Sequence, residues 1–122
     1  MNRIEFYRKR DGTSDVLDFL DDLRQRSSSD KDARIQFRQM NLYIDLLRTN
    51  GTNLSVKIAK HLDDDIWELR PGNNRVLFFY HKGDAYVLLH HFRKKTQETP
   101  PREIKQAKRE RDDYIRQKGT DK

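Results

Sequence analysis

The clearest pattern in the chain is a series of short runs rich in aromatic and aliphatic residues across residues 66–92. Runs of this length, bounded by turn-forming residues, are typical of strands. Two turn-forming segments, 71–74 and 82–84, interrupt the pattern. They divide it into three strand-like runs, residues 66–70, 75–81 and 85–92. The pattern therefore predicts three antiparallel strands joined by two short turns.

The turns also predict how these strands pair. A four-residue loop places Arg70 opposite Arg75, and the shorter turn places His81 opposite Ala85. Counting along the third strand then brings Arg75 opposite His91. One face of the sheet is therefore expected to carry Arg70, Arg75 and His91 in a row at one end. A shift of one residue in either pairing would move part of this row to the other face.

The same register assigns the other strand residues to faces. The polar row is followed on its own face by Glu68, Leu77 and Leu89. The opposite face is expected to be the core side, and it carries Trp67, Leu69, Val76, Phe78, Tyr80, Tyr86, Leu88 and His90. An apolar patch remains on the polar face, formed by Leu77, Phe79, Val87 and Leu89. Either a partner protein or the last helix of the chain could cover this patch.

Two amphipathic helices are predicted before the strands. Ser14 can cap a helix that ends in the serine run 27–29. Its apolar residues fall on one face: Val16, Phe19, Leu20 and Leu23. A longer helix is expected to start near Asp30 and to end at Asn50-Gly51. Its apolar stripe consists of Ala33, Phe37, Met40, Ile44 and Leu47. The two helices should form a hairpin that covers the apolar face of the sheet.

The rest of the chain gives weaker signals. Residues 4–8 indicate a short N-terminal strand, whereas residues 52–65 are ambiguous and end in the acidic turn Asp63-Asp64-Asp65. Thr99 is expected to cap a last helix that begins with two prolines. Residues 117–122 are expected to be a frayed tail. The prediction is an α+β fold, with a small antiparallel sheet made mixed by the N-terminal strand, a helical hairpin on one face and a C-terminal helix.

Composition narrows the class of protein. A chain of 122 residues with 34% hydrophobic and 38% charged residues is expected to form one domain, residues 1–122, with a modest core. Residues 66–122 hold 14 Lys and Arg against 8 Asp and Glu, whereas residues 1–65 hold 12 of each. This asymmetry favours a polyanionic partner. The absence of cysteine excludes disulfides, and no apolar run approaches the roughly 18 residues of a membrane span, so a cytoplasmic protein is expected.

Several runs together resemble a known family. They are Trp67-Glu68-Leu69-Arg70-Pro71-Gly72, then Arg75-Val76-Leu77, then Leu89 to Gln97, followed by Pro100, Glu103, Ile104 and Ala107. This pattern resembles the HigB-like branch of the RelE toxin superfamily. The resemblance implies a RelE-like fold and the toxin of a type II toxin–antitoxin module, a ribosome-dependent mRNA endoribonuclease that arrests translation. It also implies a cognate antitoxin, expected to be a helix-turn-helix protein, in a toxin–antitoxin hetero-oligomer. No cluster of metal-ligating residues is visible in the sequence, so catalysis without a metal or other cofactor is expected.

Cleavage of RNA without a metal requires groups that hold the phosphate and move two protons, as the 2′-hydroxyl attacks the adjacent phosphorus. Arg75 is the first candidate for the scissile phosphate, because its guanidinium can bind two phosphate oxygens at once. Lys94 and Lys95 match basic residues of the family that follow the last strand. Arg70 and Arg93 are candidates for binding flanking phosphates.

The identity of the proton acceptor is less well determined. His91 is the first candidate, because it lies on the predicted polar face and a histidine exchanges protons near neutral pH. Glu68 is the alternative base, or a carboxylate that orients Arg70 or Arg75, or one half of a purely structural pair with Arg75. Some relatives carry lysines on this strand where the chain has Ile66 and Glu68. The other function classes are a non-catalytic nucleic-acid-binding module and a phage or regulatory interaction protein.

Overall fold

The computed structural model describes residues 1–119, which form a five-stranded sheet between two helical layers. The elements in chain order are β1 (Arg3–Phe6), α1 (Asp15–Arg26), α2 (Lys31–Asn50), β2 (Ala59–Asp63), β3 (Ile66–Leu69), β4 (Asn74–His81), β5 (Ala85–Arg93) and α3 (Pro101–Gly119). The order of strands across the sheet is β1-β5-β4-β3-β2. β1 runs parallel to β5 and the other neighbours are antiparallel, so the predicted mixed sheet is confirmed.

Local capping sets the bounds of the helical hairpin. The Ser14 side chain accepts a hydrogen bond from the backbone N–H of Leu17, and that of Asp30 accepts one from Ala33. Each bond satisfies an N–H group that the first turn of a helix leaves without a partner. α2 ends at Gly51, where φ is 60° and an added Cβ would lie 2.7 Å from the hydroxyl of Tyr86. The sequence-based predictions of both helices are confirmed.

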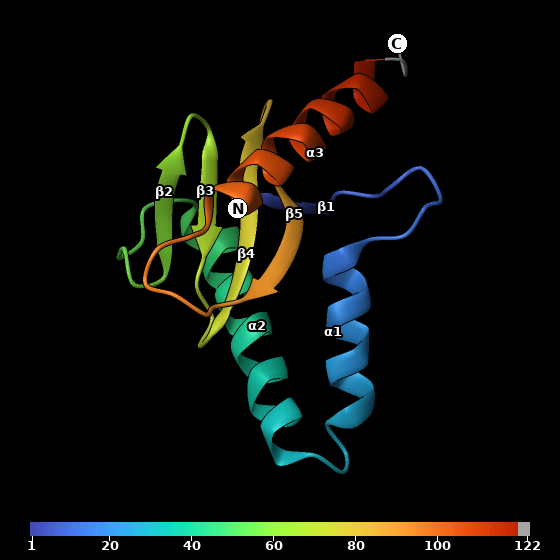
Figure 1. The fold of residues 1–122 in the computed structure, drawn as a ribbon, viewed down its shortest axis with the longest axis vertical. Coiled ribbons are helices and arrows are strands. Elements are labelled where there is room, and N and C mark those ends of the chain that lie inside the picture. The colour runs from blue at the N-terminus through green and yellow to red at the C-terminus, as the bar shows by residue number, and fades with distance from the viewer. Residues whose placement is uncertain (120–122) are drawn as a thin grey trace.

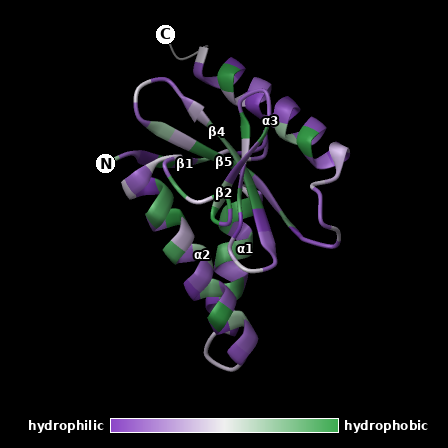
Figure 2. Ribbon diagram, turned by 90° about the vertical axis from the view of Figure 1, so that its left-hand side faces the viewer, coloured by the Kyte–Doolittle hydropathy of each residue, from purple (hydrophilic) through white to green (hydrophobic). Residues whose placement is uncertain are grey.

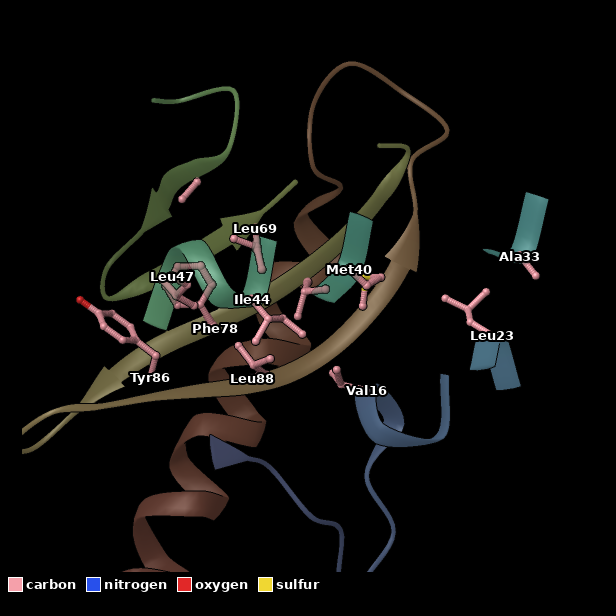
Figure 3. Packing of buried hydrophobic residues seen from close by; sticks show 12 residues of the cluster. Val16, Leu23, Ala33, Met40, Ile44, Leu47, Leu69, Phe78, Tyr86 and Leu88 are labelled. Atoms are coloured by element: carbon pink, nitrogen blue, oxygen red, sulfur yellow. The ribbon is translucent and has the colours of Figure 1, made fainter. Parts of the chain in front are cut away.

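The hairpin covers one face of the sheet, as expected, and its far end extends beyond the strands (Figure 1). Figure 3 shows Met40, Ile44 and Leu47 of α2 lying over the strands. They pack against Phe78 and Leu88 in one buried cluster. The remaining buried members of that cluster are Val16, Leu23, Ala33, Ala59, Leu69, Val76 and Tyr86. This cluster is the larger of the two cores.

α3 covers the opposite face of the sheet, so the protein has three layers (Figure 2). Its Ala107 and Tyr114 are buried against an apolar cluster formed by Tyr7, Ile66, Leu77, Phe79, Val87 and Leu89. The apolar patch of the polar face is therefore covered by the last helix of the same chain. No helix among residues 1–119 has the length and apolar character needed to cross a membrane.

The pairing of β3 with β4 is as predicted, with Glu68 opposite Leu77 and Leu69 opposite Val76. His81 also lies opposite Ala85. Other expectations require correction. The ambiguous region contains β2, an edge strand, and Thr99 lies two residues before α3 rather than at its cap position. Residues 117–119 continue α3, although fraying was expected from residue 117 onward, and residues 120–122 of that predicted tail lie outside the described residues.

A β-bulge in β5 changes which histidine lies on which face. Leu77 pairs with His90, but the next residue of β4, Phe78, pairs with Leu88, so Leu89 is an extra residue in β5. A bulge of this kind places two consecutive residues on the same side of a strand. Arg75 consequently lies opposite Phe92, and the prediction that it lies opposite His91 is wrong.

Candidate functional site

A cleft of about 420 Å³ opens where the sheet, the loop after β5 and the start of α3 meet. Its floor comes from the sheet residues Glu68, Arg75 and Phe92, and α3 contributes Arg102 and Glu103. Arg93, the last residue of β5, also lines the cleft, and the loop contributes the remaining residues, Lys94, Lys95, Thr96, Gln97, Glu98, Thr99 and Pro100. Five cationic side chains face three carboxylates in this lining, so the cleft favours an anion.

Glu68 and Arg75 form a buried charged pair at the floor of the cleft. Their side chains are only 2% and 7% exposed, and Arg75 Nε lies 3.8 Å from Glu68 Oε2. Arg70 Nε lies 3.4 Å from the same oxygen. The hydroxyl of Thr99 donates a hydrogen bond to the other oxygen, Oε1. Glu68 Oε1 therefore accepts a hydrogen bond from Thr99, whereas Oε2 is ion-paired with two guanidinium groups.

The guanidinium of Arg75 is held in place by the backbone as well. Its Nη1 donates to the carbonyl oxygens of Gly72 at 2.9 Å and of Asn74 at 2.8 Å. Burial lowers the pKa of Arg75, and the nearby charge of Glu68 partly offsets this effect. An arginine remains a cation near neutral pH even so. Within residues 1–119, Nη2 makes no hydrogen bond, which leaves donors for a bound anion.

Lys94 and Lys95 follow β5 directly, and the backbone N–H of Lys94 donates to the carbonyl of Asn73 at 2.8 Å. This bond ties the start of the loop to the turn before β4. Neither lysine side chain forms an ion pair with the part of the chain that the structure describes. Arg93 also lines the cleft, although its Nη1 donates to Gln36 and Asn74 on the hairpin side. The lysines thus add unpaired positive charge beside Arg75.

His91 lies on the other side of the sheet from this cleft. Its ring stacks on Phe19 of α1, with 3.9 Å between ring centroids, and its Nδ1 lies 2.6 Å from Asp15 Oδ2. Burial alone would raise the pKa of Asp15, but the hydrogen bonds and charge of His91 lower it on balance. The expected row of Arg70, Arg75 and His91 is therefore not formed, because the bulge turns His91 toward the helical hairpin.

His90 takes the opposite side from the one predicted, and it faces α3. Its Nδ1 lies 2.6 Å from Glu110 Oε1 and its Nε2 lies 2.9 Å from Glu103 Oε1. Burial alone would lower the pKa of His90, but hydrogen bonds and charges from Glu110 and Glu103 raise it above its ordinary value. Because both ring nitrogens face carboxylates, the charged form of the ring, with a proton on each nitrogen, fits this geometry.

The structure thus brings together five of the seven candidate residues: Glu68, Arg75, Arg93, Lys94 and Lys95. Arg70 does not line the cleft, and its Nη1 donates a hydrogen bond to the carbonyl oxygen of Val56. Sequence reasoning missed Thr99, Arg102 and Glu103 as parts of the site. Within residues 1–119, no group of three or more His, Asp or Glu side chains has an arrangement suited to holding a metal ion.

The sequence model of the family described as "Phage derived protein Gp49-like" matches residues 21–112, which is most of the chain. The chain belongs to this family. The match covers the second half of α1, α2, all of the sheet except β1, and more than half of α3, and so it includes every residue that lines the cleft. No curated protein matches the Gp49-like chain.

One similar solved structure is a chain from the heterotetrameric YoeB–YefM toxin–antitoxin complex of Staphylococcus aureus. It is 12% identical to the Gp49-like chain, with a TM-score of 0.46. The match covers 79% of this chain and 98% of that chain.

Proposed function

We propose that this Gp49-like protein is the toxin of a type II toxin–antitoxin module and that it cuts mRNA on the ribosome. The observation that carries the proposal is the cleft in which Glu68 and backbone carbonyls hold Arg75, with Lys94 and Lys95 beside it. The runs that resemble the HigB-like branch of the RelE superfamily contribute most of this cleft. They therefore support a ribonuclease more than they support a generic basic surface.

The proposed reaction is an attack by the 2′-hydroxyl on the adjacent phosphorus. Arg75 would contact the non-bridging phosphate oxygens, because its free Nη2 can donate to the charge that develops during attack. Lys94 and Lys95 would bind the same phosphate from the loop, and one of them would give a proton to the leaving 5′-oxygen. Arg93 would bind a neighbouring phosphate. No metal ion takes part in this scheme.

Glu68 fits the role of a positioning carboxylate better than that of the base. Its Oε1 already accepts a hydrogen bond from Thr99, and its Oε2 is ion-paired with the guanidiniums of Arg70 and Arg75. Arg70 would then support Arg75 indirectly, by sharing the same carboxylate. His91 is not part of the proposed site, because the sheet separates its ring from the cleft.

The proposed partners follow from this function. mRNA in the decoding site of the ribosome is the substrate, and ribosomal RNA would contact the basic second half of the chain. A cognate antitoxin, proposed to be a helix-turn-helix protein, would bind the toxin in a hetero-oligomer. The activity would therefore take place in the cytoplasm.

The test is to map mRNA ends after induced expression of the wild type and of Arg75→Ala. We expect the wild type to arrest growth and to produce new 5′ ends inside translated reading frames. Arg75→Ala should produce neither effect, because the phosphate loses its main ligand. Arg109→Ala is the matched control, because Arg109 is an exposed arginine of α3 outside the cleft.

Thermal unfolding of each variant shows whether Arg75→Ala still folds, and Arg75→Gln provides a second, milder change. Growth arrest by a folded Arg75→Ala or Arg75→Gln would remove this arginine from the site. Growth arrest without new mRNA ends would favour a module that acts by binding alone.

A further inference from the structure

Glu103 is a second carboxylate of the cleft, and nothing in the proposed reaction so far uses it. It lies in the first turn of α3, and its side chain is 16% exposed, so it is held in place but reaches the cleft. Its Oε1 is bound to His90 Nε2 at 2.9 Å. Within residues 1–119, its Oε2 makes no hydrogen bond and can accept one from a ligand.

His90 fixes the orientation of Glu103 from beneath. The ring is buried between β5 and α3, with Glu103 on one nitrogen and Glu110 on the other. Gln106 donates a further hydrogen bond to Glu110 at 3.1 Å, which fixes that carboxylate in turn. A charged ring held in this way is a strong donor, so it sets the rotamer of Glu103 and leaves one oxygen turned outward.

We propose that Glu103 is the base that accepts the proton of the attacking 2′-hydroxyl, and that His90 is its positioning residue. The inference rests on the proposed ribonuclease function and names a catalytic group for it. The 2′-oxygen forms a bond to phosphorus as its proton passes to Glu103 Oε2. The bond from phosphorus to the 5′-oxygen breaks, and Lys94 or Lys95 protonates that oxygen. The products are a 2′,3′-cyclic phosphate and a 5′-hydroxyl.

The other carboxylates of the cleft fit this role less well. Glu68 is only 2% exposed; its Oε1 accepts a hydrogen bond from Thr99, and its Oε2 is ion-paired with two guanidiniums. Positive charge beside a carboxylate makes it a weaker base. Glu98 lies in the loop, is exposed, and forms no side-chain hydrogen bond or ion pair within the described residues. A base must be held within hydrogen-bond distance of the proton that it takes. Among the three, Glu103 alone combines a fixed position with a free oxygen.

The experiment measures single-turnover cleavage of mRNA bound to programmed ribosomes at saturating toxin, which separates the chemical step from binding. Glu103→Gln should cut about 10²- to 10⁴-fold more slowly than the wild type, the usual range for loss of a base. The amide can still accept the hydrogen bond of His90, so α3 should remain docked. The toxin concentration that gives half of the maximal rate should stay within about threefold of the wild-type value, because the lost interaction is made only in the transition state.

Glu98→Gln is the matched control, because it removes the same charge from the same cleft. It should cut at least about tenfold faster than Glu103→Gln, because it removes charge from the cleft but not the base. Glu103→Asp, which keeps a carboxylate at a shorter reach, should cut faster than Glu103→Gln. His90→Gln should lower the saturating rate without weakening binding, as expected of a positioning residue.

Several results would overturn the inference. A folded Glu103→Gln that cuts within about tenfold of the wild type would exclude Glu103 as the base. An equal loss of cleavage rate in Glu98→Gln would mean that only the charge of the cleft matters. A loss of rate that disappears after correction for the fraction of folded protein would mean that Glu103 has a structural role. A wild type that cuts no mRNA overturns the proposed function together with this inference, whereas the other outcomes leave the proposed function standing.

Discussion

The two charged residues at the floor of the cleft, Glu68 and Arg75, are almost completely buried. Burying two charges costs free energy, and the pair is tolerated because each partner compensates the other. Glu68 has more partners than either arginine has carboxylates. It is ion-paired with both Arg75 and Arg70, and it accepts a hydrogen bond from Thr99. Removing the carboxylate should therefore disturb more of the protein than removing either arginine.

Glu68→Gln is expected to destabilise the protein by about 3–5 kcal/mol, because it leaves the buried Arg75 without its counter-charge. The measurement is the free energy of unfolding in urea at neutral pH. Glu98→Gln, an exposed carboxylate of the same cleft, should change that free energy by no more than about 0.5 kcal/mol. A loss below about 1 kcal/mol for Glu68→Gln would mean that water, and not Glu68, compensates these arginines.

At the residue scale, the sequence correctly predicted the positions of those cleft residues that a tight turn fixes. Pro71-Gly72 and the loop length fixed the pairing of β3 with β4, and with it the positions of Glu68 and Arg75. His90 and His91 each lie on the face opposite to the one predicted, because β5 contains one extra residue, Leu89. A bulge in the middle of a uniformly apolar strand leaves no mark in the alternation pattern, since Val87, Leu88 and Leu89 are all apolar. Glu103 was missed for the same reason, because its contact depends on which face His90 takes.

At the scale of elements, α1 and α2 were predictable because their caps and apolar stripes agree. β2 was not, because its burial pattern is mostly exposed and an edge strand has only one neighbour to shape its sequence. The start of α3 was predicted one residue early. Thr99, expected to cap that helix, donates instead to Glu68 and so links the loop to the cleft floor.

α3 is attached to the sheet mainly through polar contacts. Only Ala107 and Tyr114 are buried along it. Lys108 pairs with Asp63 at 2.7 Å, and Arg111 pairs with Asp64 at 3.0 Å. Two tyrosine hydroxyls add further bonds across this contact, from Tyr7 to Asp113 and from Tyr114 to Glu5. The contact between His90 and its two glutamates is the most buried of these, and it lies next to the cleft.

The raised pKa of His90 makes the docking of α3 depend on pH. Burial opposes the charge, but Glu110 and Glu103 outweigh it, so the folded pKa lies above the ordinary value of 6.5. The stability that His90 contributes is then fully present below about pH 6.5 and is lost as pH rises through the raised pKa. The measurement compares the free energy of unfolding of the wild type and His90→Gln from about pH 6 upward.

We expect the advantage of the wild type over His90→Gln to be largest at the low end of this range and to shrink as pH rises. The protection of the α3 amides, measured relative to their intrinsic exchange rates at each pH, should fall over the same range, while that of the α2 amides should not change. Carboxylates face His90 from α3, at Glu103 and Glu110, and the charge of Asp15 also acts on it from α1. An advantage that is constant or grows with pH would mean that the ring is neutral in the folded protein.

At the scale of the whole molecule, the two helical layers have different tasks. The hairpin of α1 and α2 builds the larger core against one face of the sheet (Figure 1). α3 closes the other face and supplies one wall of the cleft. The net charge of +6 comes from the half of the chain that forms this second face and its loop. The larger core and the cleft thus lie on opposite sides of one sheet.

This division explains how much of the molecule the sequence predicted. The hairpin side was predictable because apolar periodicity specifies a core. The cleft side is specified by contacts between residues far apart in the chain, such as Thr99 with Glu68 and Glu103 with His90. Such contacts leave no recognisable pattern in any short stretch of the sequence. The family resemblance indicated a phosphate site in this region, but it could not indicate which carboxylate turns toward the cleft.

The most direct measurement of the proposed chemistry uses ribosome-bound mRNA in which only the nucleotide before the cut carries a 2′-deoxyribose. The wild type should cut the unmodified mRNA to a 2′,3′-cyclic phosphate and a 5′-hydroxyl, and it should leave the modified mRNA intact, because the attacking group is missing. Cutting of both mRNAs at the same rate, or of neither, would contradict a cleft built for attack by the 2′-hydroxyl.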